Sequence, residues 1–142
     1  MNVLKLKALF LLLAFLAAAA AWAEPAGDDP LGKYLFPPDL VMKYSQDLGL
    51  DERQRTAVKE NVQKAQTKFV DLQWELQEAT QKMIHLLQAR PVDEAAALAA
   101  ADKVLGLERD IKRTQLSLLI RLKNLLSEPQ QAKLTELRKR AE

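Results

Sequence analysis

The stretch from residue 51 to residue 90 reads DERQRTAVKENVQKAQTKFVDLQWELQEATQKMIHLLQAR and contains neither Gly nor Pro. Its apolar residues recur at alternating spacings of four and three: Val58, Val62, Ala65, Phe69, Leu72, Leu76, Ala79, Met83 and Leu86. This spacing keeps one stripe of a helix facing a partner helix. It predicts one helix from Asp51 to Arg90, roughly 55–60 Å long at 1.5 Å per residue. Pro91 is expected to end it, because the residue before a proline is disfavoured in a helix.

A second long helix is predicted after Pro91, over residues 92–126. Its expected seam is Ala97, Ala101, Val104, Glu108, Ile111, Gln115, Leu118, Leu122 and Leu125. Four leucines are expected to widen this stripe: Leu98, Leu105, Leu119 and Leu126. The short turn at Pro91 makes the two long helices antiparallel neighbours, so residues 51 and 127 should meet at the same end of the hairpin.

Shorter segments flank this hairpin. Residues 24–37 are rich in Pro and Gly and predict an irregular arm, whose apolar residues should pack onto the domain: Leu31, Tyr34, Leu35 and Phe36. Short helices are predicted over about 38–48, with Gly49 just beyond its end, and over about 128–140. Residues 38–142 therefore form one four-helix domain. Since two long helices alone bury little apolar surface, we expect the short helices to fold back and a second chain to pack alongside.

Composition excludes several kinds of chemistry. The 142 residues include 4 Gly, 1 His and no Cys, so disulfides, Cys-based zinc sites and a Cys nucleophile are excluded. The single histidine, His85, has Gln81 and Gln88 as helical neighbours, which are poor metal ligands. We expect a surface or interface histidine. Neither a nucleophile–base pair nor a phosphate loop is present, so no enzyme activity, cofactor or metal site is predicted.

Residues 1–23 have the pattern of a secretory signal peptide. Lys5 and Lys7 precede an apolar run over residues 8–20, and Ala21-Trp22-Ala23 is a small-x-small cleavage site. An uncleaved anchor is the alternative, although the apolar run is shorter than the about 20 residues that span a membrane. The two lysines account for the whole net charge of +2, so residues 24–142 are neutral overall. An exported chain without cysteine fits the bacterial periplasm.

Two matching motifs stand at the predicted shared end of the hairpin. They are Leu50-Asp51-Glu52-Arg53-Gln54 and Leu126-Ser127-Glu128-Pro129-Gln130. Asp51 and Ser127 can accept hydrogen bonds from the free N–H groups of the helix that follows. Gln54 and Gln130 can return a bond to the N–H of the capping residue, which completes a capping box.

The paired motifs resemble the two LTxxQ boxes of the Spy/CpxP-type periplasmic stress proteins. Asp51 and Ser127 replace the usual Thr, and both are good capping residues. The resemblance covers most of residues 24–142 and implies a cradle-shaped antiparallel homodimer of hooked hairpins. It also implies one of three roles: an ATP-independent chaperone, an envelope-stress regulator that contacts a sensor kinase, or a metal sensor. Metal-sensing relatives use several His, which this chain lacks.

Some apolar residues fall outside the two seams and are candidates for a binding surface. They are Val70, Trp74, Ile84, Leu116 and Ile120. Nearby basic residues are Arg113, Arg121 and Lys123; residues 109–140 carry a net charge of +6, whereas residues 24–52 carry −5. This surface fits either a dimer interface or the loose binding of unfolded chains, for which charge speeds the encounter. A solvated helix face is the alternative for the basic residues.

The sequence therefore predicts an all-α hooked hairpin, expected to be a homodimer. The expected function is that of a non-enzymatic periplasmic chaperone or stress-response protein whose partners are unfolded proteins and, by resemblance, a sensor kinase. A metal-responsive regulator and a structural helical adaptor are the alternatives. Neither nucleic-acid binding nor stable membrane insertion after signal cleavage is expected.

Overall fold

A computed structural model describes residues 31–141, and within that range the protein is helical without strands. The elements are η1 (Gly32–Tyr34), α2 (Pro38–Lys43), α3 (Glu52–Leu87), α4 (Glu94–Leu125) and α5 (Glu128–Ala141). Residues from Tyr34 onward form one compact unit. The predicted signal peptide and residues 24–30 of the predicted arm lie outside the described residues. Among the described helices, none combines the length and the apolar character needed to cross a membrane.

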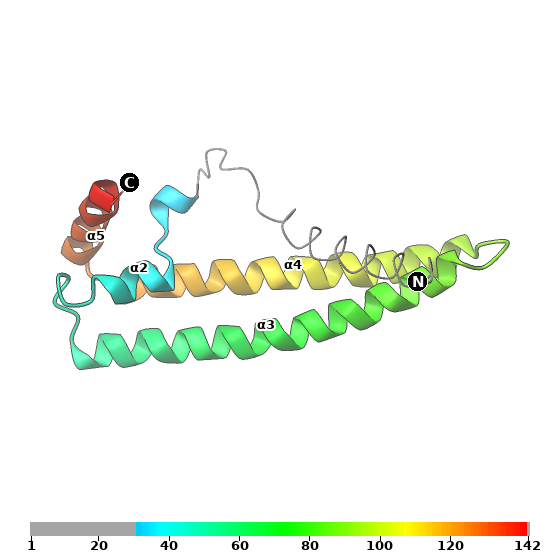
Figure 1. Ribbon diagram of the computed structural model, residues 1–142, viewed down its shortest axis with the longest axis horizontal. Coiled ribbons are helices and arrows are strands. Elements are labelled where there is room, and N and C mark those ends of the chain that lie inside the picture. The colour runs from blue at the N-terminus through cyan, green and yellow to red at the C-terminus, as the bar shows by residue number, and fades with distance from the viewer. Residues whose placement is uncertain (1–30, 142) are drawn as a thin grey trace, which may run out of the picture. The chain divides into compact units, whose positions relative to one another are not determined.

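Helices α3 and α4 lie side by side as a long hairpin, with α2 and α5 at its open end (Figure 1). All nine residues of the predicted α3 seam are buried or half-buried, with Val58 and Leu72 the most enclosed. Helix α3 has 36 residues, which is about 54 Å at 1.5 Å per residue. The predicted all-α hairpin with short helices at its ends is therefore confirmed.

The turn between the long helices starts earlier than predicted. Helix α3 ends at Leu87 rather than Arg90, because Pro91 has no N–H to donate to the carbonyl four residues before it. The peptide bond between Arg90 and Pro91 is cis. Helix α4 begins at Glu94, where the side chain of Asp93 accepts a hydrogen bond of 3.0 Å from the Ala96 N–H. Asp93 is a helix cap that the sequence analysis did not identify.

The seam of α4 differs from the predicted one in its first half. Ala100 and Leu107 are buried there, Gln115 is exposed, and Leu98 and Leu105 are exposed instead of widening the seam. The observed inward residues are Ala100, Val104, Leu107, Ile111, Thr114, Leu118, Leu122 and Leu125. The predicted seam residues Ala97, Ala101 and Glu108 are half-buried as well, whereas Gln115 is exposed.

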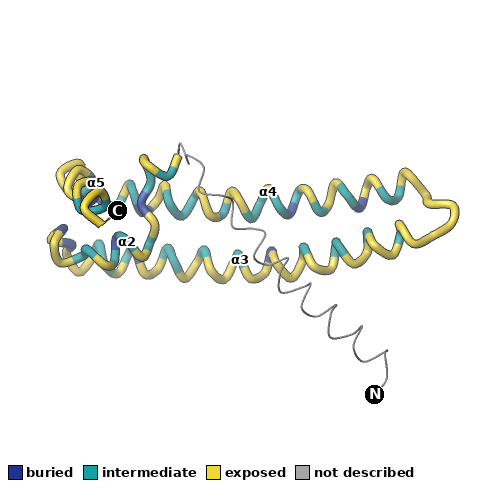
Figure 2. The backbone as a smooth tube through the Cα atoms, turned by 45° about the horizontal axis from the view of Figure 1, so that its top comes forward, coloured by how far each residue is buried: buried dark blue, intermediate teal, exposed yellow. Residues whose placement is uncertain are grey.

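The hydrophobic core is concentrated at the open end of the hairpin (Figure 2). Its buried members come from the arm, from α2 and the turn after it, from the start of α3, from the end of α4 and from α5: Phe36, Val41, Leu48, Leu50, Val58, Leu122, Leu126 and Leu134. The short helices α2 and α5 contribute Val41 and Leu134, so they cover this end of the hairpin as predicted. Within the described part of the arm, Phe36 is buried, but Leu31 and Tyr34 are exposed, contrary to prediction.

Helix α2 is shorter than predicted and ends at Lys43 instead of Leu48. Turns carry the chain from Tyr44 to Gly49, and Leu48 still reaches the core. Gly49 has a φ of +61°, a left-handed conformation that favours glycine. This reversal returns the chain to the start of α3.

Candidate functional site

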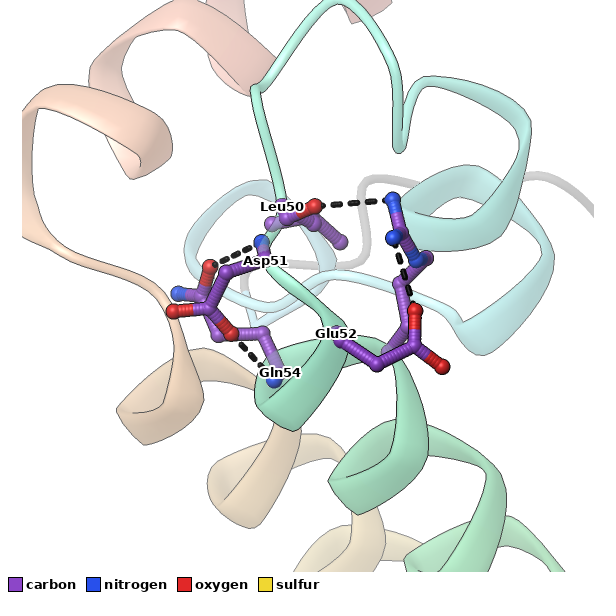
Figure 3. A network of polar contacts seen from close by, with 5 residues as sticks. Leu50, Asp51, Glu52 and Gln54 are labelled. Carbon is purple, nitrogen blue, oxygen red and sulfur yellow. Dashed lines mark hydrogen bonds and ion pairs between the residues drawn. The ribbon is translucent and has the colours of Figure 1, made fainter.

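Both motifs at the open end form capping boxes. The Asp51 carboxylate accepts a hydrogen bond of 2.7 Å from the Gln54 N–H, and the Gln54 side chain accepts one of 3.2 Å from the Asp51 N–H (Figure 3). At the start of α5, Gln130 N–H donates to Ser127 Oγ at 3.3 Å, and Ser127 N–H donates to Gln130 Oε1 at 2.9 Å. Each box therefore satisfies free N–H groups at a helix start.

The two glutamines also bind each other across the fold. Gln54 Nε2 donates to Gln130 Oε1 at 2.8 Å, and Gln130 Nε2 donates to Gln54 Oε1 at 3.2 Å. The second N–H of Gln54 donates to the Leu125 carbonyl at 2.9 Å, and that of Gln130 donates to the Leu48 carbonyl at 3.2 Å. Each amide thus uses two donors and two acceptors, the full capacity of its side chain.

The first turn of α3 carries an ion pair beside the capping box. Arg55 donates to Glu52 at 2.8 Å and, through its other terminal nitrogen, to the Leu50 carbonyl at 2.9 Å (Figure 3). The hydrogen bond from Arg55 and its positive charge hold the pKa of Glu52 below its ordinary value of 4.5. The bond to the Leu50 carbonyl ties the segment that enters α3 to the first turn of the helix, and Leu50 itself is buried.

The five candidate surface residues are all exposed, but the structure does not gather them into one patch. Val70 and Trp74 adjoin a shallow hollow lined by α3 alone, and 63% of Trp74 is accessible. We name these two residues the α3 apolar strip. Ile84 is also exposed and lies closer to the turn at Pro91. Leu116 and Ile120 are exposed on α4.

The structure adds two residues to the exposed surface of α4. Leu98 and Leu105, which the sequence analysis assigned to the seam, are about as exposed as Trp74. Leu98, Leu105, Leu116 and Ile120 follow one another at intervals of 7, 11 and 4 residues, which bring all four to one side of the helix. We name Leu98, Leu105, Leu116 and Ile120 the α4 apolar strip. Leu87 and Val92 are further exposed apolar residues at the turn.

The three candidate basic residues differ in their surroundings. Arg113 and Arg121 are exposed and line a groove between α3 and α4. Lys123 is half-buried, and its Nζ donates to the Tyr34 carbonyl at 2.9 Å. Lys123 therefore holds the end of the arm against α4 and is less available to a partner than the two arginines.

Metal-ligating side chains do not converge within the described part of the chain. His85 is exposed on α3. Residues 31–141 contain no group of three or more His, Asp or Glu side chains placed to hold a metal ion. The donor set of one chain, as far as the structure describes it, does not fit a heavy-metal site.

Comparison with known proteins gives one match. A family model described as heavy-metal resistance matches residues 6–133, which is most of the chain. Neither a curated protein nor a solved structure matches the chain.

Proposed function

The chain belongs to the heavy-metal resistance family, part of the Spy/CpxP-like LTxxQ group, and from this premise we propose that it is a non-enzymatic, ATP-independent periplasmic chaperone of the envelope stress response. Membership confirms the resemblance suggested by the boxes around Gln54 and Gln130. The family favours a protein of heavy-metal resistance or sensing, and the chaperone role is our finer proposal. Its clients are unfolded or stress-damaged proteins.

The observation that carries this proposal is the pair of apolar strips on the outer sides of the hairpin. Trp74 and Leu105 leave 63% and 60% of their surfaces accessible, although the helices bearing them are well packed on their inner sides. Separate apolar strips fit clients without a fixed structure, because each contact is small and none demands a matching shape. The absence of Cys from the sequence also keeps such a surface from forming mixed disulfides with clients.

Export is the second part of the proposal. It rests on residues 1–23, whose charged start, apolar run and Ala-Trp-Ala end are typical of a cleavable signal. The protein isolated from cells should begin at Glu24, which mass spectrometry of the intact protein would measure. A periplasmic protein that retains Met1 would contradict cleavage.

A metal-responsive regulator is the second candidate, favoured by the description of the family. The described residues of one chain offer His85 without converging carboxylates. Sensing by this protein would therefore require ligands shared between chains or supplied from outside residues 31–141. Titration with zinc, nickel, cobalt and copper tests this candidate directly: saturable binding at one ion per dimer would support it.

Suppression of aggregation of a denatured client is the decisive assay for the chaperone proposal. We expect Trp74→Ser and Ile120→Asp each to reduce protection of the client while leaving the helix content unchanged. Gln81→Ser and Gln115→Asp are matched controls, because both residues are exposed and polar on the same two helices. The control variants should protect as well as the parent, with and without added metal.

Two outcomes would contradict the assignment of the binding surface. If both apolar variants protect as well as the parent, the clients bind elsewhere. If the variants lose protection because they dissociate into monomers, the strips form the interface between protomers. Sedimentation of each variant, measured beside the aggregation assay, separates these outcomes.

A further inference from the structure

The long hairpin carries a polar groove between its two helices, whose lining includes none of the residues of the apolar strips. Its volume is about 460 Å³, and its lining is Asn61, Lys64, Ala65, Lys68, Asp110, Arg113, Thr114, Ser117, Leu118 and Arg121. Helix α3 supplies one wall and α4 supplies the other. We name this feature the cationic groove, because four of its residues are basic and one is acidic.

The four cations of this groove have no anionic partner among the described residues. The ion pairs of residues 31–141 involve other basic residues: Arg55, Lys103, Arg109 and Lys139. The one acid of the groove, Asp110, contacts Arg109 at 3.4 Å. The groove therefore presents an excess of positive charge to whatever enters it.

Helix stability does not account for this arrangement. Lys64 and Lys68 stand one turn apart, and like charges at that spacing destabilise a helix slightly. Arg113 and Arg121 stand two turns apart on the opposite wall, with Ser117 midway between them. Along each wall the cations span about 6–12 Å, at 1.5 Å per residue.

We propose that the cationic groove binds an oligophosphate-type anion, a ligand that carries several phosphate groups in a row. Cations stand on both walls, so a fitting ligand has negative oxygens on both sides, as a row of phosphates does. A guanidinium group can donate two parallel hydrogen bonds to phosphate oxygens, and an ammonium group adds a compact charge. The Ser117 hydroxyl and the second N–H of Asn61 can donate to such a ligand as well, whereas the Thr114 hydroxyl already donates to the Asp110 carbonyl.

This inference goes beyond the proposed chaperone function and does not depend on it. The source of the phosphates is either a soluble oligophosphate or the headgroups of anionic phospholipids at a membrane surface. Both present the same chemistry to Arg113 and Arg121. The experiment therefore uses sodium tripolyphosphate alone and, in a separate arm, vesicles of phosphatidylglycerol.

Calorimetric titration of the purified protein with tripolyphosphate tests the proposal. We expect saturable binding that weakens as salt rises from about 50 mM to about 300 mM, because exposed charges are screened. The double variant Arg113→Gln/Arg121→Gln should bind at least about tenfold more weakly, because it removes both guanidinium groups that donate charge-assisted hydrogen bonds to phosphate oxygens. The double variant Lys59→Gln/Lys112→Gln is the matched control, because both lysines are exposed outside the groove.

The control variant removes the same net charge and should keep the affinity of the parent within about twofold. Equal weakening in both double variants would overturn the proposal, because it would show attraction to net charge alone. Absence of saturable binding to tripolyphosphate at low salt would overturn it as well. Tighter binding of poly-glutamate than of tripolyphosphate would replace phosphate by carboxylate as the ligand. Vesicle binding that the arginine variant loses would support the proposal and identify lipid headgroups as the source.

Discussion

Gln54 and Gln130, which are 76 residues apart in the chain, donate a hydrogen bond to each other across the open end of the hairpin. Each of them also completes the capping box of its own helix. Their remaining N–H groups reach the Leu125 and Leu48 carbonyls. The end of α4 is thereby joined to the start of α3, and the start of α5 to the turn before α3.

A single oxygen-for-nitrogen change should disrupt this network. Gln54→Glu removes both N–H donors and places a carboxylate against Gln130 Oε1, so we expect the free energy of unfolding to fall by about 1–3 kcal/mol at neutral pH. Gln77→Glu, on the exposed face of α3, is the control and should change it by less than about 0.5 kcal/mol. Chemical denaturation measures both. Equal stability of the two variants would show that the amide donors of Gln54 contribute nothing.

The two caps should differ in strength. Asp51 accepts a short, charge-assisted hydrogen bond of 2.7 Å, whereas Ser127 accepts a neutral one of 3.3 Å. We expect Asp51→Ala and Ser127→Ala to cost about 0.5–2 kcal/mol each, with Asp51→Ala the larger. Thermal unfolding measures which of the two alanine variants is less stable. Ser127→Thr should be about as stable as the parent, because Thr can also cap the helix. Unchanged melting of both alanine variants would exclude a capping role.

The sequence predicted these local features because they depend on nearby residues. A capping box needs a cap and a partner three positions later, and a seam needs only its period, so Asp51, Gln54 and the α3 stripe could all be identified. The bond between Gln54 and Gln130 could not be predicted from spacing, because it depends on how the ends of the hairpin meet. The cationic groove likewise combines residues from two helices.

The seam of α4 shows that a stretch of nearly identical residues leaves the register of a periodic pattern ambiguous. Residues 95–101 read AAALAAA, so several registers fit them equally well. The predicted seam includes Glu108 and Gln115 and is widened by Leu105. The structure instead buries Leu107, at 4% exposure, and turns Leu105 outward. The sequence signal that identifies the observed seam is an inward stripe without charged residues.

The ion pair at the start of α3 predicts a pH dependence. Arg55 lowers the folded-state pKa of Glu52 below 4.5, so the stabilisation is present above the pKa of the unfolded carboxyl group and is lost as pH falls through the lower, folded-state value. The difference in unfolding free energy between the parent and Glu52→Gln should therefore shrink as the solution is taken to about pH 3. A constant difference over this range would contradict the shift, as would an NMR titration of Glu52 above 4.5.

Gly106 offers a stabilising substitution. It lies inside α4, and a Cβ at this position would meet only the end of the Arg109 side chain, at 4.0 Å. Gly106→Ala should raise the free energy of unfolding by about 1 kcal/mol, because alanine loses less backbone entropy in a helix. Gly49→Ala is the contrasting variant and should destabilise the protein, since its φ of +61° disfavours a side chain. Chemical denaturation of both variants checks the opposite signs.

The outward apolar strips predict self-association through one of the two strips, which leaves the other strip available to clients. Trp74, Leu105 and Ile120 are exposed in one chain, and apolar surface of this extent on long helices favours burial against a second copy. The purified protein should sediment as a dimer at micromolar concentration, and its melting temperature should rise with protein concentration, because association stabilises the folded chain by mass action. Leu105→Asp should shift the equilibrium toward monomer if the α4 apolar strip forms the interface, whereas Trp74→Ser should do so if the α3 apolar strip does. A protein that stays monomeric, with a melting temperature independent of concentration, would contradict dimerisation and leave both strips free for clients.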